Sequence, residues 1–223
     1  MAHGKVKYIF TMVEMSKLAV FDGYKVLPPA EEGSHPFVFD GNESIYLKNR
    51  SSIDISSDYL TKMTSMIEDT ITMSDKPIEI LDVGGGYNSV LAREIALEHG
   101  DNVRTTNLDV VLNTNVMKPN NFRAILGDVL NMRDIPSEHV DFLYSYKLLL
   151  WFRFKEDGRL HRALSEIARV LQPNRSAFLD MGIGYDMLSA EKFYKENKWN
   201  VKIELGQYNE KKTPITYMVM KKN

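Results

Sequence analysis

Apolar and polar positions divide this chain into short hydrophobic runs that alternate with segments of helical periodicity. The run 78–83 ends in the glycines 84–86, and the apolar side chains of residues 90–97 then recur at the helical spacing. A strand, a glycine turn and a helix in this order form the unit that grips phosphates and nucleotides in doubly wound α/β folds. Glycine suits such a turn because the chain reverses tightly and a ligand approaches its bare backbone.

The same alternation continues to the end of the chain and predicts an α/β fold with a mostly parallel, doubly wound sheet. The expected elements are strands at 103–108, 122–126, 140–146 and 177–181, helices at 160–171 and 189–197, and a closing antiparallel hairpin of 201–205 with 215–220.

Residues 1–76 precede the glycine turn and differ in character from the rest. A loose helical pattern over 8–21 ends at Asp22-Gly23, and a proline-containing loop and an aromatic stretch follow it. Residues 56–58 offer N-caps for a helix whose apolar face carries Leu60, Met63, Ile67 and Ile71. We predict two parts, an N-terminal helical extension or lid at 1–76 and a ligand-binding domain at 77–223.

Composition narrows the classes of function. The 223 residues carry a formal net charge of −2 and 26% charged side chains, which is not typical of a protein that coats nucleic acid. The chain has no cysteine, which excludes disulfides, thiolate metal sites and a cysteine nucleophile. No apolar run reaches membrane-spanning length and no signal-peptide pattern opens the chain, so a cytoplasmic enzyme without a membrane partner is expected.

An acidic residue stands where the second predicted strand ends. The carboxylate of Asp109 can accept hydrogen bonds from both hydroxyls of a ribose, a role that serves NAD and S-adenosylmethionine alike. Gly84, Gly86 and Ser89 nearly satisfy the dinucleotide fingerprint. These residues alone leave both cofactors open.

Three motifs resemble those of the class I S-adenosylmethionine-dependent methyltransferases, in particular the small-molecule, type 11-like group. Asp82 and the glycines after it resemble the first motif, with Asn88 where the family usually has glycine. Residues 163–173 resemble the late motif Leu-x-Glu-Ile-x-Arg-Val-Leu-Lys-Pro-Gly-Gly, with Asn174-Arg175 in place of its two glycines. Asp141-Phe142 resembles the reversed form of the Phe-Asp that opens the fourth strand in the family.

Two of these departures put asparagine where the family has glycine. Asparagine tolerates a left-handed backbone better than other residues that have a side chain. We therefore expect Asn88 and Asn174 to stand in for the missing glycines, and Pro173-Asn174 suits the centre of a type II turn, whose second central residue needs positive φ.

The resemblance covers about residues 76–223 and implies a Rossmann-like, mostly parallel seven-stranded sheet with S-adenosyl-L-methionine as cofactor. It assigns the acid after the third strand, Asp128, to the adenine amino group, and dinucleotide folds have no requirement for an acid there. The residues that it assigns to the cofactor are Asp82, Gly84, Gly86, Asn88, Asp109, Val110, Asp128, Val129 and Tyr146.

The chemistry of this family asks little of the protein. A sulfonium makes its methyl group electrophilic unaided, so the chain mainly has to hold the acceptor in line and exclude water. His35, Tyr46 and Tyr146 are the candidates for a general base, which is needed where the acceptor arrives protonated. Metal-dependent relatives place an Asp on the fourth strand and an Asp-Asn pair after the fifth. This chain has Tyr144-Ser145-Tyr146 and Asp180-Met181 in the corresponding stretches, so no metal site is expected.

We expect metal-independent methyl transfer to a small-molecule acceptor by in-line displacement. The alternatives are a protein or RNA acceptor, a non-catalytic S-adenosylmethionine-binding scaffold or regulatory protein, and an aminopropyltransferase on the same fold. Residues 37–73 are expected to cover the methyl group and set the choice of acceptor. The alternative is that their aromatic side chains, Phe37, Phe39, Tyr46 and Tyr59, dock the first helices against the sheet.

Overall fold

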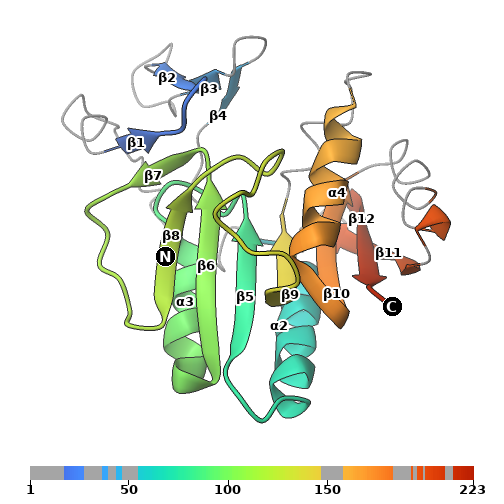
Figure 1. The fold of residues 1–223 in the computed structure, drawn as a ribbon. Helices are drawn as coiled ribbons and strands as arrows, with labels where there is room; N and C mark the ends of the chain where they lie inside the picture. Colours follow the sequence, from blue (N-terminus) through green and yellow to red (C-terminus); the bar gives the residue numbers. More distant parts are fainter. Residues whose placement is uncertain are drawn as a thin grey trace, which may run out of the picture.

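The structure is a computed structural model that describes residues 18–27, 37–39, 44–46, 55–146, 158–182, 192, 195–197, 199–208 and 213–223. At its centre lies a seven-stranded sheet, seen with the carboxyl ends of its central strands upward in Figure 1. In spatial order its strands are β11 (Asn200–Tyr208), β12 (Thr213–Lys221), β10 (Leu171–Gly182), β9 (Val140–Ser145), β5 (Ile78–Val83), β6 (Val103–Asp109) and β8 (Phe122–Leu126).

The five strands from β10 to β8 run parallel, and β12 and β11 add an antiparallel hairpin at one edge. This confirms the predicted fold class, a Rossmann-like, doubly wound sheet with a C-terminal antiparallel hairpin. All six residues of β9 are buried, as expected for a central strand that helices cover on both faces. The strand order reverses at β5, so the carboxyl ends of β5, β6 and β9 flank the position where such sheets hold ligands.

Helices cover the two faces of the sheet, with α2 (Ser57–Thr72) and α3 (Val90–His99) behind it and α4 (Arg159–Val170) in front (Figure 1). Side-chain alternation along β5 divides the core accordingly. Ile78 and Ile80 pack with α2 and α3, whereas Leu81 and Val83 pack with α4. Asp82 therefore belongs to the face that α2 and α3 cover.

The predicted helix after residue 56 is present as α2. Ser56 is its N-cap, with an extended backbone and a side chain that accepts a hydrogen bond from the Tyr59 amide at 3.3 Å. Met63 and Ile67 lie on the buried face, as their spacing predicts.

The N-terminal segment differs from the prediction in the residues that the structure describes. Leu18–Val20, expected at the end of a helix, forms the strand β1 and pairs with β7 (Val111–Asn113), which the sequence did not predict. Leu18 and Val20 pack against a cluster that contains Tyr87, and three residues are too few for apolar spacing to separate a strand from a helix. A small antiparallel sheet of β2 (Lys25–Leu27), β3 (Phe37–Phe39) and β4 (Ser44–Tyr46) follows. Most of the helix predicted over 189–197 lies outside the described residues.

The motif departure at Asn174-Arg175 lies at the amino-terminal edge of the sheet. Asn174 has a φ of 63°, the left-handed conformation predicted for a residue that replaces glycine, and its amide donates to the Lys222 carbonyl at 2.8 Å. The Nε atom of Arg175 lies 3.0 Å from an oxygen of the buried Asp141 carboxylate, and the other oxygen accepts from the Glu79 amide at 2.9 Å. Both replacements therefore have structural roles on the edge opposite the ligand edge.

Candidate functional site

The glycine turn at the end of β5 is formed as predicted, but a different residue takes the left-handed position before α3. Gly84 and Gly86 have φ values of 73° and 91°, which favour glycine. Ser89, the N-cap of α3, has a φ of 53°, whereas Asn88 does not adopt positive φ. The expectation that Asn88 replaces a left-handed glycine is wrong. Its side chain instead accepts a hydrogen bond from Asn113 of β7 at 2.8 Å.

A buried amide that sequence reasoning missed holds this turn in place. Asn107, fully buried on β6, accepts from the Gly85 amide at 3.2 Å and donates to the Gly86 carbonyl at 3.2 Å and to the Ser89 hydroxyl at 2.7 Å. Asn107 gives no periodic signal, because it follows Arg104, Thr105 and Thr106 in a strand that is already rich in polar residues. Its position directly beside the turn, in register with Asp82, was the available clue.

Asp82 lies beneath the turn, with 2% of its surface exposed. A Cβ atom at Gly85 would collide with the side chains of Asp82 and Asn107, so packing inside the protein requires glycine there. Tyr144 of β9 is the register partner of Asp82. Burial raises the pKa of the Tyr144 hydroxyl well above its usual range, and the negative charge of Asp82 raises it further. A contact between Asp82 and a cofactor stays a prediction.

Asp109 stands at the tip of β6 beside the glycine turn. One of its oxygens accepts from the Gly86 amide at 2.9 Å and the other from the Val111 amide at 3.1 Å. Val110 is half-buried beside the cluster of Tyr87 and Val111. The carboxylate is thus held at the strand end beside the turn, and its contact with a ribose stays a prediction.

Asp128 follows the end of β8, the neighbouring strand. Its two oxygens accept from the Leu130 amide and from the Tyr24 hydroxyl, both at 2.8 Å. Val129, the next residue, points into the core on the α4 face and is 5% exposed. In the N-terminal turn that carries Tyr24, the Phe21 amide donates to the Val110 carbonyl at 2.9 Å. One short turn therefore touches both strand ends where cofactor contacts were predicted.

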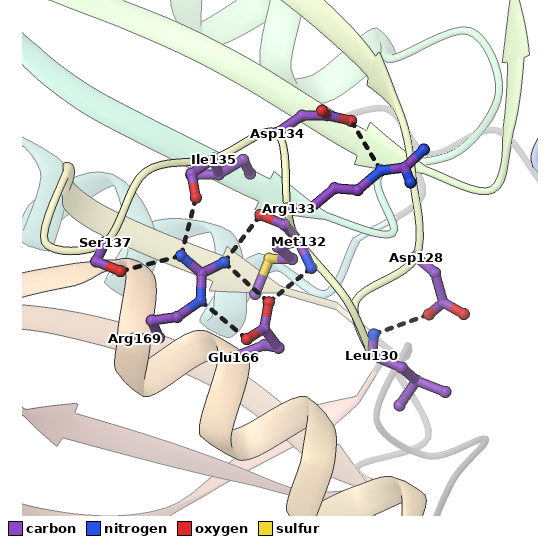
Figure 2. Close-up of polar contacts among 9 residues, drawn as sticks. All are labelled: Asp128, Leu130, Met132, Arg133, Asp134, Ile135, Ser137, Glu166 and Arg169. Atoms are coloured by element: carbon purple, nitrogen blue, oxygen red, sulfur yellow. Dashed lines mark hydrogen bonds and ion pairs between the residues drawn. The ribbon is translucent and has the colours of Figure 1, made fainter.

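The loop after Asp128 is fastened to α4 by two residues of the late motif, Glu166 and Arg169 (Figure 2). Arg169 donates to both carboxylate oxygens of Glu166 at 2.9 Å, and Glu166 accepts from the Met132 amide at 2.6 Å. The Arg169 guanidinium also donates to the carbonyls of Met132 and Ile135 and to the Ser137 hydroxyl. Hydrogen bonding to Arg169 lowers the pKa of Glu166, and the same bonds raise the pKa of Arg169.

Of the three candidates for a general base, the structure describes the side chain of Tyr146 alone. Tyr146 is 3% exposed, and its ring centroid lies 4.9 Å from that of Tyr59. Tyr59 is fully buried and donates to the carbonyls of Ser145 and Phe178 at 3.0 and 3.2 Å, so it docks α2 on the sheet, as the alternative reading of the N-terminal aromatics expects. His35 lies outside the described residues, and Tyr46 is described by its backbone alone.

A pocket opens beside Asp128 where no motif predicted one. Its volume is about 340 Å³. The residues that line it come from the N-terminal turn, the loop after β8 and the first turn of α4: Phe21, Gly23, Tyr24, Asp128, Leu130, Asn131, Arg159 and Arg162. Because these segments are far apart in sequence, only the fold brings them together.

Two features are absent from the part of the chain that the structure describes. Among those residues, no three His, Asp or Glu side chains gather in a way that could hold a metal ion. No helix in the described ranges is both long enough and apolar enough to cross a membrane. Metal independence itself stays a prediction.

The groups at this edge of the sheet fit S-adenosylmethionine. A glycine turn with two left-handed glycines and two half-buried carboxylates stand at the adjacent ends of β5, β6 and β8. Carboxylates accept hydrogen bonds from ribose hydroxyls and from an amino group, and the start of α3 behind the turn presents backbone amides. These acceptors and backbone amides suit the hydroxyls and amino group of an adenosine, and the individual contacts stay predictions.

Comparison with known proteins agrees with this assignment. Residues 81–179 match the family model described as a methyltransferase domain. No curated protein sequence matches the chain. The solved structures with similar folds include the N-methyltransferase NodS from Bradyrhizobium japonicum in complex with S-adenosyl-L-homocysteine, at a TM-score of 0.52 and 11% identity over 76% of this chain and 90% of that one.

Two more solved structures share the fold at low sequence identity. The precorrin-6y C5,15-methyltransferase from Geobacter metallireducens gives a TM-score of 0.51 and 13% identity, over 79% of this chain and 94% of that one. The 1,6-didemethyltoxoflavin-N1-methyltransferase from Burkholderia thailandensis gives 0.50 and 11%, over 85% of this chain and all (100%) of that one. Residues 81–179 therefore match a methyltransferase domain, and the similar solved structures share the Rossmann-like fold of this chain.

Proposed function

We propose that this chain transfers the methyl group of S-adenosylmethionine to a small-molecule acceptor, without a metal ion. The observation that carries the proposal is the placement of the Asp109 and Asp128 carboxylates at neighbouring strand ends beside the glycine turn. S-adenosylmethionine, when bound, supplies a methyl group that its sulfonium already activates. The remaining task of the chain is to bind, to orient and to exclude water.

Named residues divide that task between them. Asp109 accepts hydrogen bonds from the two ribose hydroxyls. Asp128 accepts one from the adenine amino group, either beside the Tyr24 hydroxyl that already donates to it or after that hydroxyl has rotated away. Gly84 and Gly86 let the backbone approach the cofactor without a Cβ in the way. Tyr146 is the one described candidate for accepting an acceptor's proton, and its burial suits a site from which water is excluded.

Titration calorimetry with S-adenosylhomocysteine tests the cofactor assignment. The wild-type chain should bind it, and Asp109→Ala should weaken binding by about tenfold to a hundredfold, because hydrogen bonds to a charged group contribute about 1.5–3 kcal/mol. Asp134→Ala is the matched control, since that carboxylate lies in the loop between β8 and β9 and its side chain is 59% exposed. Binding of NAD with no binding of S-adenosylhomocysteine would show that the assignment is wrong.

A second experiment separates enzyme from scaffold. The chain is incubated with S-adenosylmethionine labelled in its methyl group and with a metabolite extract, with and without a chelator. Label transferred to a small molecule in the presence of chelator supports the proposal. Cofactor retained without transfer supports the non-catalytic scaffold, and transfer that needs added magnesium contradicts metal independence.

A further inference from the structure

The N-terminal turn from Phe21 to Tyr24 is fastened to the strand ends at which the cofactor is expected. It follows β1, which lies beside β7 near the carboxyl ends of β6 and β8 (Figure 1). The Phe21 amide donates to the Val110 carbonyl at 2.9 Å, and the Tyr24 amide donates back to the Phe21 carbonyl at 3.1 Å. The turn lies outside residues 81–179, so the match to the methyltransferase domain gives it no role.

Tyr24 contacts the carboxylate that the proposed function gives to adenine. Its hydroxyl donates to Asp128 at 2.8 Å, and its ring packs against the cluster of Tyr87 and Val111. A hydrogen bond from the adenine amino group to the same carboxylate has a length of about 2.7–3.2 Å. A base that binds to Asp128 therefore lies next to the Tyr24 side chain.

Phe21 adds a second aromatic ring at this position. Its ring centroid lies 6.3 Å from that of Tyr24, with the two rings inclined at 54°. Both residues are half-buried, and both line the pocket of about 340 Å³ that Asp128 also lines. A ring that borders a cavity offers its face or edge to a flat base, and stacking on an aromatic side chain is a common way to bind one.

We propose that this pocket receives the adenine ring of the cofactor and that Phe21 and Tyr24 help to bind it. Phe21 contacts the base with its ring, whereas Tyr24 is a positioning residue that holds the Asp128 carboxylate. The inference rests on the proposed function, from which it takes the adenine and its partner Asp128. It adds a linkage between two parts of the chain, because a ligand that contacts the docked turn must stabilise the docking by as much as the docking strengthens binding.

Amide hydrogen exchange on the full chain measures this linkage, with and without saturating S-adenosylhomocysteine. We expect the ligand to slow exchange of the Phe21 and Tyr24 amides by at least about tenfold, since both amides are protected only while the turn is docked. Adenosine, which has the base but lacks the amino-acid part, should slow them as well. The Asn174 amide is the internal control, because it donates to the Lys222 carbonyl at the opposite edge of the sheet and should change by less than about twofold.

Calorimetry with variants of Phe21 separates contact with the base from packing of the turn. Phe21→Ala should bind S-adenosylhomocysteine at least about fivefold more weakly. Phe21→Leu keeps apolar volume without an aromatic face and should still lose at least about threefold, whereas Phe21→Tyr keeps the ring and should stay within about twofold. Leu27→Ala is the matched control, since it truncates an apolar side chain of the same segment that is 38% exposed and does not line the pocket.

The outcomes keep this inference apart from the cofactor assignment. If S-adenosylhomocysteine binds to the wild type but leaves exchange of the turn unchanged, the inference is overturned and the cofactor assignment stands. Binding to Phe21→Leu as tight as binding to the wild type likewise overturns the contact between Phe21 and the base. If S-adenosylhomocysteine does not bind to the wild type at all, the proposed function fails and the inference fails with it.

Discussion

Replacing Arg169 by alanine removes the side chain that joins α4 to the loop after Asp128. Its guanidinium donates to the two oxygens of Glu166 at 2.9 Å, to the carbonyls of Met132 and Ile135 at 2.9 and 3.0 Å, and to the Ser137 hydroxyl at 3.2 Å. The alanine variant keeps the bond from the Met132 amide to Glu166 and loses all of these.

The cost can be worked out from these contacts. The pair with Glu166 is partly solvated, with side-chain exposures of 31% and 20%, so its two bonds together are worth about 1 kcal/mol. The three bonds to neutral oxygens are worth about 0.5–1 kcal/mol each, because water can partly replace the guanidinium. The sum is about 3 kcal/mol, which for a chain of 223 residues lowers the melting temperature by about 6–12 °C.

Urea unfolding and thermal melts measure this loss, with Arg133→Ala as the matched control. Arg133 lies in the same loop, but its side chain is 70% exposed and its ion pair with Asp134 spans 4.0 Å, so about 0.5 kcal/mol or less is expected. Because the loop carries Asp128, we also expect Arg169→Ala to weaken S-adenosylhomocysteine binding by about threefold to tenfold, or about 0.7–1.4 kcal/mol. If Arg169→Ala is no less stable than Arg133→Ala, the hydrogen bonds of Arg169 do not hold the loop on α4, which would refute this prediction.

Three further predictions concern stability. The pKa of Glu166 is lowered in the folded chain from its ordinary 4.5, so its contribution to the free energy of unfolding is present above about pH 4.5 and is lost as the pH falls through the folded pKa. The difference in stability between the wild type and Glu166→Gln should therefore narrow from pH 7 to pH 3. A constant difference would contradict this. Asn107→Ala leaves the buried Gly85 amide and Gly86 carbonyl without their side-chain partner and should cost about 2–4 kcal/mol in urea unfolding, whereas a loss below 1 kcal/mol would show that the turn holds without it. Tyr59→Phe removes a buried hydroxyl that donates to two carbonyls and should cost about 1–2 kcal/mol with no change in S-adenosylhomocysteine affinity; a weakened affinity would place Tyr59 at the site.

The sequence predicted the central strands well because each begins with an apolar residue and lies between turn signals and helical segments. The strand over 122–126 has the predicted limits, and that over 103–108 is longer by one residue. Where the chain pairs over three residues, as β1 does with β7, periodicity carries too little information, and the expected helix through residue 20 was wrong.

The acidic residues at the ends of the central strands were predictable from the sequence, but the residues around them were not. Asp109 and Asp128 follow strand ends, which sequence can locate, and the structure brings them to the same edge. Asn107 was not predictable, because it forms its hydrogen bonds to the turn from inside a strand. Tyr24 and Arg162, which are about 140 residues apart in the chain, line the same pocket. Long-range contacts of this kind follow from topology, and no local pattern encodes them.

The ion pair between Arg175 and Asp141 has a consequence for how relatives of this chain change together. Each residue departs from the family pattern, Arg175 by replacing a glycine and Asp141 by reversing a Phe-Asp pair, and the two stand 3.0 Å apart at the amino-terminal edge. Considered separately, the two departures look like the loss of family motifs in a protein that is no longer an enzyme. Read together, they are one compensated exchange, since an acid buried to 1% exposure needs a cation beside it. Homologues that keep an acid at position 141 should therefore carry a base at position 175, and those that restore glycine there should lose the acid.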